Sequence, residues 1–363
     1  MVLLEPLEFL RNMPPVKLAI IGLGLMGSRH VEVVNSFDGC DLVGVCDLNL
    51  DLRVIADRHD IPFFQDIDEM LDRTQPDGTI LATQSAAHAE TFEACARRGV
   101  HALIEKPVAD TTQAALRIAD LADLTNTRVL VGHHRRHNPL VKAAHDVVTS
   151  GQIGDLLAVS MMWTLMKPDR YFDIAWRSVR PDGGLVLINL VHELDILRYT
   201  CGEIDQVFAQ GRSKARGFEV EDSVSISITF RSGTVATILG SDAVTAPWSY
   251  EATTGENPLY FNVPESCYYF TGTDGALAFP QMELWSYPDR DRRGWQHPME
   301  KSVVPVSRAD SLTVQLAHFC DVVRGTRPPL VDARDGARSL TAALAVLESI
   351  STNKPIRPSI DPA

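Results

Sequence analysis

The sequence lacks long apolar runs and an excess of basic residues. No hydrophobic stretch approaches the roughly 18 residues that a membrane-spanning helix needs. Lys and Arg number 34 against 47 Asp and Glu, which gives a formal net charge of -13. A surface of this sign repels phosphate backbones and anionic lipid headgroups. We therefore expect no nucleic-acid partner and no membrane association.

Paired cysteines, repeats and low-complexity tracts are also missing. The six cysteines form no CxxC pair, and most stand in apolar runs, where a free thiol behaves as a small hydrophobic side chain. The first residues carry Glu5 and Glu8, without the basic stretch and cleavage site of a secretion signal. These absences predict a cytoplasmic protein in a reducing compartment. The length of 363 residues suggests two domains, at roughly 150 residues each.

The first third of the chain alternates short apolar runs with longer amphipathic stretches, which is typical of βαβ units on a parallel sheet. Strands are expected at residues 17–21, 42–46, 79–82, 102–104 and 129–131, and helices at 51–59, 66–72, 87–98 and 112–124. Asp66 and Asp110 are expected as N-caps, and Gly99 as a C-cap.

The pattern changes near Pro139, which indicates a second, α+β domain. Alternating strands are expected at 155–163, 220–230 and 234–239, the last two joined by a three-residue hairpin connection. Helices are expected at 140–149, 185–200, 313–323 and 333–350. We place the domains at 1–134 and 135–363.

A GxGxxG motif follows the first expected strand and opens the next helix. Gly22, Gly24 and Gly27 permit a tight turn and close approach of a pyrophosphate, and Leu25 and Met26 lie within the motif. Free N–H groups at the helix N-terminus would stabilise the phosphate charge. The alternative is a glycine-rich turn that binds nothing.

Asp47 ends the next strand, twenty residues after Gly27, where an acidic residue can hold the adenosine ribose. A carboxylate there repels a 2′-phosphate, and the following Leu48 and Asn49 supply no cation to bind one. The sequence therefore favours NAD over NADP.

Glu105, Lys106 and Pro107 follow the strand at 102–104, so they fall at the carboxyl edge of the sheet, where ligands bind in such folds. Pro107 disfavours the helical conformation at Lys106. The ammonium group could stabilise alkoxide character on a substrate as hydride leaves. Taken alone, a lysine at a strand end is more often a solvated surface charge, and the neighbouring motifs favour the functional interpretation.

In order and spacing, these motifs resemble the Gfo/Idh/MocA family of NAD(P)-dependent oxidoreductases. The resemblance also includes the His/Arg-rich turn 133–137 and a Gly183-Gly184 segment leading to His192 and Asp195. It implies a Rossmann domain, a second domain with a large open, mostly antiparallel sheet, and oxidation of sugars, cyclitols or related alcohols. It further implies that Lys106 polarises the reacting oxygen, that His192 accepts the proton, and that the chain forms a homodimer or homotetramer through the second sheet.

The resemblance extends to Thr83 and His88, which match the family's cofactor-contacting turn, although Gln84 and Ser85 replace its usual Pro and Asn. Glu105 belongs to the same expected cofactor site. On the substrate side we expect His134, Arg136, Trp176, Arg177, Asn189 and His192. A solvated basic turn and a metal site are the alternatives for residues 133–137, and the metal site lacks the acid or cysteine partners that zinc would need nearby. Packing aromatics and exposed cations are the alternative for Trp176 and Arg177.

Asn189, His192 and Asp195 are the polar positions on an otherwise apolar face of the helix expected at 185–200. An imidazole there suits removal of an alcohol proton, although a buried structural histidine is the alternative. Ile188 stands where many family members carry an aspartate, so the usual sugar-binding arrangement is altered.

We expect an NAD-dependent dehydrogenase of a cyclic polyol; the alternatives are an enzyme acting on a non-sugar ring such as a dihydrodiol, and a non-catalytic NAD-binding sensor.

Overall fold

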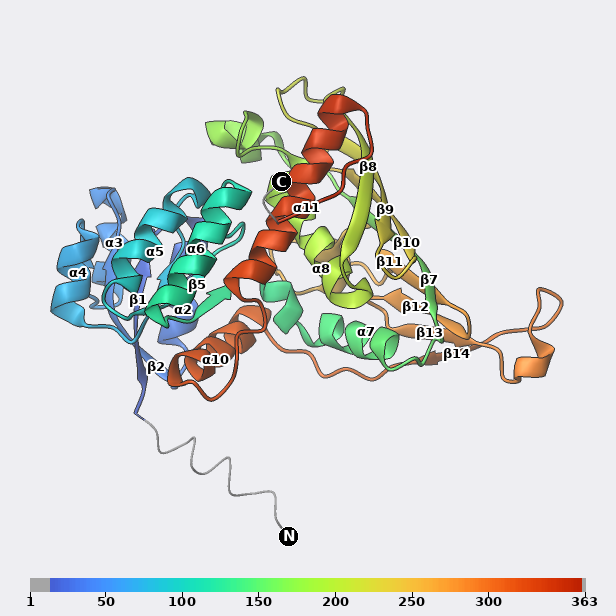
Figure 1. The fold of residues 1–363 in the computed structure, drawn as a ribbon, viewed down its shortest axis with the longest axis horizontal. Helices are drawn as coiled ribbons and strands as arrows, with labels where there is room; N and C mark the ends of the chain where they lie inside the picture. Colours follow the sequence, from blue (N-terminus) through green and yellow to red (C-terminus); the bar gives the residue numbers. More distant parts are fainter. Residues whose placement is uncertain (1–13, 361–363) are drawn as a thin grey trace, which may run out of the picture. The chain divides into compact units, whose positions relative to one another are not determined.

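The computed structural model describes residues 14–360, so Glu5 and Glu8 lie outside the described part of the chain. Two compact units form within it, and Figure 1 colours both along the sequence. The first unit comprises the chain up to Gly132 together with Leu312–Gly336, and the second comprises His133–Ser311 and the residues from Ala337 onward. The first unit is therefore built from two segments that lie far apart in the sequence.

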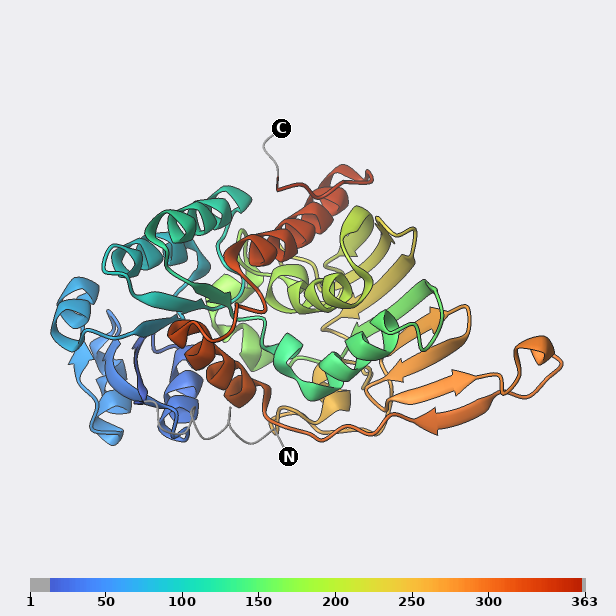
Figure 2. The ribbon, with the colours of Figure 1, turned by 60° about the horizontal axis from the view of Figure 1, so that its bottom comes forward.

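The first unit contains a six-stranded parallel sheet in the order β3-β2-β1-β4-β5-β6, which is the strand order of a Rossmann fold. Its strands are β1 (Val16–Ile21), β2 (Cys40–Cys46), β3 (Phe63–Phe64), β4 (Gly78–Leu81), β5 (His101–Ile104) and β6 (Val129–Val131). The central strands consist almost wholly of buried apolar residues, because helices cover the sheet on both faces (Figure 2). The expected doubly wound sheet is confirmed, and the two-residue β3 was not predicted.

The helices of this unit are α2 (Leu25–Asn35), α3 (Arg53–Arg58), α4 (Ile67–Thr74), α5 (His88–Ala96), α6 (Thr112–Thr125) and α10 (Ser311–Arg324). Phe319 of α10 packs into the same apolar core as Val31 of α2 and Leu18 of β1. Asp66 caps α4 as expected, since its side chain accepts the Glu69 N–H. The cap expected at Asp110 is wrong: Thr111 caps α6 by accepting the Ala114 N–H. Gly99 has a positive φ, but the C-cap of α5 is Arg97.

The second unit contains an eight-stranded sheet in the order β14-β13-β12-β11-β7-β10-β9-β8. Its strands are β7 (Leu156–Thr164), β8 (Ile204–Arg212), β9 (Ser223–Phe230), β10 (Val235–Ser241), β11 (Tyr268–Gly272), β12 (Gly275–Phe279), β13 (Glu283–Ser286) and β14 (Glu300–Val303). Every neighbouring pair is antiparallel except β7 and β10. The large, mostly antiparallel sheet and the β9–β10 hairpin are confirmed.

Helices cover one face of this second sheet. They are α7 (Pro139–Thr149), α8 (Val191–Cys201) and α11 (Ala333–Thr352), while the short α9 (Tyr250–Thr254) follows β10 (Figure 1). Leu194 of α8 and Val346 of α11 share one core with Ile226 and Ile238 of the sheet. The helix expected at 185–200 is present, but Val186–Leu190 forms a π-helical turn, so the α-helical spacing assumed for its first residues is wrong.

No helix within residues 14–360 is long and apolar enough to cross a membrane.

Candidate cofactor and substrate sites

The glycine motif forms the turn between β1 and α2, and two of its glycines are required by the fold itself. Gly22 has φ +90°, and a Cβ there would lie 2.7 Å from the backbone of Ala82. A Cβ on Gly27 would lie 1.8 Å from the Gly22 carbonyl oxygen. Any larger residue at these two positions would force the turn apart.

Gly24 differs, because a Cβ there would meet nothing within 4 Å and its φ is -61°. The structure of the turn would therefore accept a larger residue at this position. The open space lies at the N-terminus of α2, whose first turn carries no acidic side chain, and Leu25 beside it is 75% exposed. Met26 is half-buried. We call the turn Gly22–Gly27, with the open space at Gly24, the glycine cradle. It lies at the positive end of α2 and therefore suits the pyrophosphate of a dinucleotide.

Asp47 lies at the end of β2, and backbone N–H groups hold both of its carboxylate oxygens. The Leu23 N–H donates to Oδ2 at 2.6 Å, and the Asn49 N–H donates to Oδ1 at 2.8 Å. The side chain is therefore tied to the glycine turn itself. It remains half-exposed, with lone pairs left to accept hydrogen bonds from ribose hydroxyls. Leu48, which follows it, is 84% exposed and carries no charge.

Lys106 follows β5 and is held in place by two buried side chains. Its backbone N–H donates to Glu105 Oε2 at 3.1 Å, and Glu105 Oε1 lies 2.8 Å from His30 Nε2. Both Glu105 and His30 are almost fully buried. The sequence analysis missed His30; its position three residues after Gly27, on the first turns of α2, was the available signal.

His88 joins the turn after β4 to the chain beyond Lys106. Its Nε2 lies 3.2 Å from the Thr83 carbonyl oxygen, and its Nδ1 lies 3.3 Å from that of Val108. Burial lowers the pKa of His88, so the ring is neutral near pH 7. Thr83 itself is half-buried. A neutral imidazole has one N–H, so His88 donates to one of these two carbonyl oxygens.

In the second unit, imidazole rings gather around His192 at the first turn of α8. The His134 ring centroid lies 5.3 Å from that of His192, and the His133 centroid lies 6.2 Å away. His134 opens the 3₁₀ turn His134–His137 and is half-buried, whereas His192 is 6% exposed. Sequence reasoning found both the turn and the helix, and the structure brings them together.

Arg136 binds Asp195 of α8 through two hydrogen bonds, from Nε at 2.9 Å and from Nη2 at 2.6 Å. Burial alone would raise the pKa of Asp195, but the Arg136 guanidinium and His133 hold it well below its usual range. Ser339 of α11 donates to the same carboxylate at 2.7 Å. The structure thus places Arg136 in an ion pair that joins the turn to α8; its expected contact with substrate stays a prediction.

Arg135 makes a second, deeper link between the turn and α8, which the sequence analysis did not foresee. Its Nη1 donates to Glu193 Oε1 at 2.5 Å, and its Nη2 donates to Glu251 Oε1 at 2.6 Å. Trp163 donates to the other oxygen of Glu251 at 2.8 Å. These groups are nearly all buried, so removing Arg135 would leave two carboxylates without their shared counter-ion.

The remaining candidates lie around two 3₁₀ turns, Asp169–Asp173 and Ala175–Ser178. The Arg177 guanidinium stacks 4.0 Å from the Tyr171 ring centroid and donates to its carbonyl oxygen, while Trp176 is 44% exposed. Asn189 accepts a hydrogen bond from Lys167 at 2.6 Å. Lys106 belongs to the first unit and these residues to the second.

Comparison with known proteins decides the family. A model of an oxidoreductase family with an NAD-binding Rossmann fold matches residues 16–133, and the model of that family's C-terminal α/β domain matches residues 146–357. The chain belongs to the Gfo/Idh/MocA family. It is therefore an oxidoreductase with an NAD-binding Rossmann fold, and its glycine cradle and Asp47 suit that cofactor.

Curated relatives of this Gfo/Idh/MocA chain span most of its length. It is 25% identical over 342 residues to the rhizopine catabolism protein MocA of Rhizobium meliloti, covering 92% of this chain and 95% of that protein. It is 24% identical over 357 residues to the myo-inositol 2-dehydrogenase of Thermotoga maritima, covering 94% and 98%.

A solved structure supports the fold of this family member. An oxidoreductase from Agrobacterium radiobacter, in complex with NAD⁺, L-tartaric acid and magnesium, aligns with a TM-score of 0.79 at 18% identity, covering 95% of this chain and 98% of that one. Within residues 14–360, no three His, Cys, Asp or Glu side chains are grouped so that they could hold a metal ion.

Proposed function

We propose that this protein is an NAD-dependent dehydrogenase that moves a hydride between nicotinamide and a secondary alcohol or hemiacetal carbon of a sugar, cyclitol or related cyclic polyol. The observation that carries the proposal is that the glycine cradle, Asp47 and Lys106 stand at the carboxyl edge of one parallel sheet. Relatives named as a myo-inositol 2-dehydrogenase and a 1,5-anhydro-D-fructose reductase support the substrate class.

In this proposal the first unit holds the cofactor and the second contacts the substrate. The cofactor residues are Gly22, Gly24, Leu25, Met26, Gly27, Asp47, Thr83, His88, Glu105 and Lys106. When bound, the nicotinamide accepts or donates the hydride. NAD is preferred over NADP, because the carboxylate fixed by the Leu23 and Asn49 N–H groups would repel a 2′-phosphate.

Two side chains perform the proton chemistry. The Lys106 ammonium donates a hydrogen bond to the reacting oxygen and stabilises its alkoxide character. His192 takes the alcohol proton in oxidation and returns it in reduction. His134, Arg136, Trp176, Arg177 and Asn189 complete the proposed substrate contacts. The His134 ring against His192 supports the placing of a base on this turn of α8.

A ring with fewer hydroxyl groups, such as a dihydrodiol, is the second candidate substrate. Ile188 supports it, because a half-buried aliphatic side chain one turn before His192 offers no hydrogen bond to a sugar hydroxyl. A non-catalytic NAD sensor is the remaining alternative, and hydride exchange with any alcohol would exclude it.

The test is a panel of sugars, inositols, sugar acids and cyclic diols with NAD, read by NADH absorbance. We expect oxidation of at least one cyclic polyol, and loss of that activity in His192→Ala. Turnover confined to dihydrodiols would favour the second candidate. NADH binding without turnover of any compound would contradict the dehydrogenase and favour the sensor.

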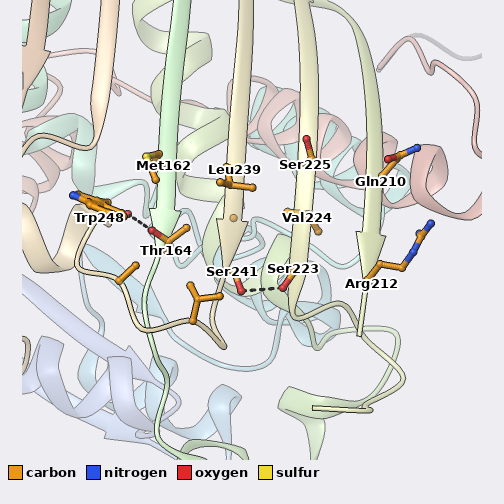
Figure 3. A pocket seen from close by; sticks show the side chains of 13 residues that line it. Met162, Thr164, Gln210, Arg212, Ser223, Val224, Ser225, Leu239, Ser241 and Trp248 are labelled. Carbon is orange, nitrogen blue, oxygen red and sulfur yellow. Dashed lines mark hydrogen bonds between the residues drawn. The ribbon is translucent and has the colours of Figure 1, made fainter. Parts of the chain in front are cut away.

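We further propose that the protein is a homodimer or homotetramer through the helix-free face of its second sheet. That face exposes Val235 and Leu239 by 50% each and Tyr269 by 43%. A hollow of about 520 Å³ lies on this face. Figure 3 shows Leu239, Met162 and Trp248 among the residues that line it. Apolar side chains gathered on one sheet face mark an association surface.

A further inference from the structure

Two of the six cysteines, Cys40 and Cys320, meet in the first unit although they stand far apart in the sequence. Cys40 is the first residue of β2, and Cys320 lies on α10, in the segment that returns to this unit late in the chain. Both are free thiols, both are almost fully buried, and both belong to the apolar core that contains Leu18.

The register of the parallel sheet shows which way Cys40 points. Leu18 of β1 pairs with Leu42 of β2 on one side and with Gly78 of β4 on the other. Residues paired in this way point to the same face of a sheet, and so do residues two apart on one strand. Cys40, two residues before Leu42, therefore points to the same face as Gly78.

Helix α10 covers that face. A Cβ on Gly78 would meet side chains of α10 at 3.0 and 3.1 Å. At the end of the helix, Arg324 donates to the Gly39 carbonyl oxygen at 3.1 Å, directly before Cys40. Cys320 stands four residues before Arg324 on the same α-helix, so both lie on one side of it. The geometry of the sheet and of the helix thus brings the two sulfur atoms together.

The two thiols are in hydrogen-bonding contact, and the contact makes their acidities unequal. It is the main reason that the pKa of Cys320 is lowered and that of Cys40 is raised. Burial opposes the shift at Cys320, and the Arg324 guanidinium adds to it. A sulfur with thiolate character beside a second thiol is suited to disulfide formation.

The remaining cysteines have a different environment. Burial raises the pKa of each of them, namely Cys46, Cys95, Cys201 and Cys267. Cys201 is nevertheless the most accessible of the six, because the other five are buried. Reactivity by exposure and reactivity by thiolate character therefore point to different cysteines.

We propose that Cys40 and Cys320 are a redox-sensitive pair, which forms a reversible disulfide between β2 and α10 when the protein meets a peroxide. The Cys320 thiolate attacks one oxygen of hydrogen peroxide, the O–O bond breaks, and the departing hydroxide takes up a proton to become water. The Cys40 sulfur then attacks the sulfenic acid on Cys320, and the hydroxyl leaves with the Cys40 proton as a second water. Two thiols are oxidised and one peroxide is reduced. The proposal does not depend on the proposed function.

The test treats the reduced full-length protein with hydrogen peroxide, blocks the remaining thiols with N-ethylmaleimide, and maps its peptides by mass spectrometry without reduction. We expect a peptide pair linked through Cys40 and Cys320, which dithiothreitol releases. In Cys40→Ala the reaction should stop at a sulfenic acid on Cys320, which dimedone captures. Cys201→Ala is the matched control, because it removes the most accessible thiol, and it should leave the link unaltered.

Thermal melting gives a second measurement. The link closes a long loop of the chain, so the oxidised wild type should melt about 5 °C or more above the reduced protein. Oxidised Cys40→Ala should show no such rise. Oxidation in urea should give mixed pairs among the six cysteines, because only the folded chain holds Cys40 beside Cys320. Absence of the link in the folded wild type, the same mixed pairs there as in urea, oxidation of Cys201 ahead of Cys320, or a linked protein that melts no higher would overturn the inference.

Discussion

Two buried side chains, Glu105 and His30, hold the backbone at Lys106. Glu105 binds its backbone N–H, and His30 of α2 contacts the other oxygen of Glu105. The bond to Glu105 is made by the backbone N–H of Lys106, and any residue at this position except proline retains that group.

Lys106→Met should therefore lower kcat by about 10²- to 10³-fold, as expected when a donor to a developing oxyanion is removed. NADH affinity should stay within about twofold, because the proposed contact is to the reacting oxygen and not to the pyrophosphate. Steady-state rates and fluorescence titration measure the two quantities. Near-normal turnover would remove Lys106 from the mechanism.

Asp47 should determine the choice of cofactor. Asp47→Ala removes both the ribose acceptor and the charge that repels a 2′-phosphate, so the ratio of kcat/KM for NAD over NADP should fall by at least about tenfold. The measurement is made on wild type and variant with both cofactors. Equal or better use of NADP by the wild type would contradict the assignment.

His88 gives a pH dependence of stability with a definite sign. Burial lowers its pKa in the folded protein, whereas the unfolded chain takes up the proton at the ordinary value of about 6.5. Stability is therefore lost as the pH falls through 6.5, by up to about 1.4 kcal/mol at pH 5.5. Between pH 8 and pH 5.5, the Tm of His88→Gln should fall by less than the Tm of the wild type. Equal falls in Tm for the two proteins would contradict a lowered pKa of His88.

At the level of single residues, sequence reasoning correctly placed Asp47 and Lys106 just after the ends of their strands, because this position follows from local pattern; their roles stay predictions. It could not find the pairing of Arg136 with Asp195, or of Lys167 with Asn189, because these partners stand 59 and 22 residues apart and meet only through tertiary packing. The basic turn was accordingly assigned to substrate when Arg136 also has a buried partner.

At the level of elements, the glycine turn combines two kinds of constraint. Gly27→Ala should lower Tm and prevent NADH binding, because its Cβ would collide with the Gly22 carbonyl oxygen. Gly24→Ala should leave Tm within about 1 °C yet weaken NADH binding about tenfold or more, because only a bound pyrophosphate occupies that space. Thermal melts and fluorescence titrations of both variants test this. Unchanged NADH affinity in Gly24→Ala would refute the cradle.

Most helices could be predicted because their apolar periodicity is local, whereas the strands β3, β8 and β11 to β14 were not predicted. Two of the missed features depend on groups that are distant in the sequence. Strand β3 exists because Val45 and Asp47 donate to the carbonyl oxygens of Pro62 and Phe64, which no pattern within two residues can signal. The π-helical turn likewise depends on Glu221 binding the Val186 N–H from another part of the chain.

For the whole molecule, the exposed sheet face should control assembly. Leu239→Asp places a charge in the centre of the proposed contact and should shift the protein towards a smaller species, because burying an isolated carboxylate is unfavourable. Leu259→Asp, at a position that is 87% exposed on the same unit, is the matched control and should change nothing. Sedimentation velocity distinguishes the species. A monomeric wild type, or an unaltered Leu239→Asp, would contradict assembly through this face.

The return of residues 312–336 to the first unit sets an order of events during protein synthesis. Phe319 and Leu316 of α10 belong to the core beneath β1, and the Val131 N–H of β6 donates to the Val331 carbonyl oxygen. The ribosome must therefore add about 200 residues after β6 before that core can close, which takes roughly 10 to 40 s at 5–20 residues per second. Throughout that interval the nascent nucleotide-binding half presents an apolar surface, and this surface is the natural target for a chaperone.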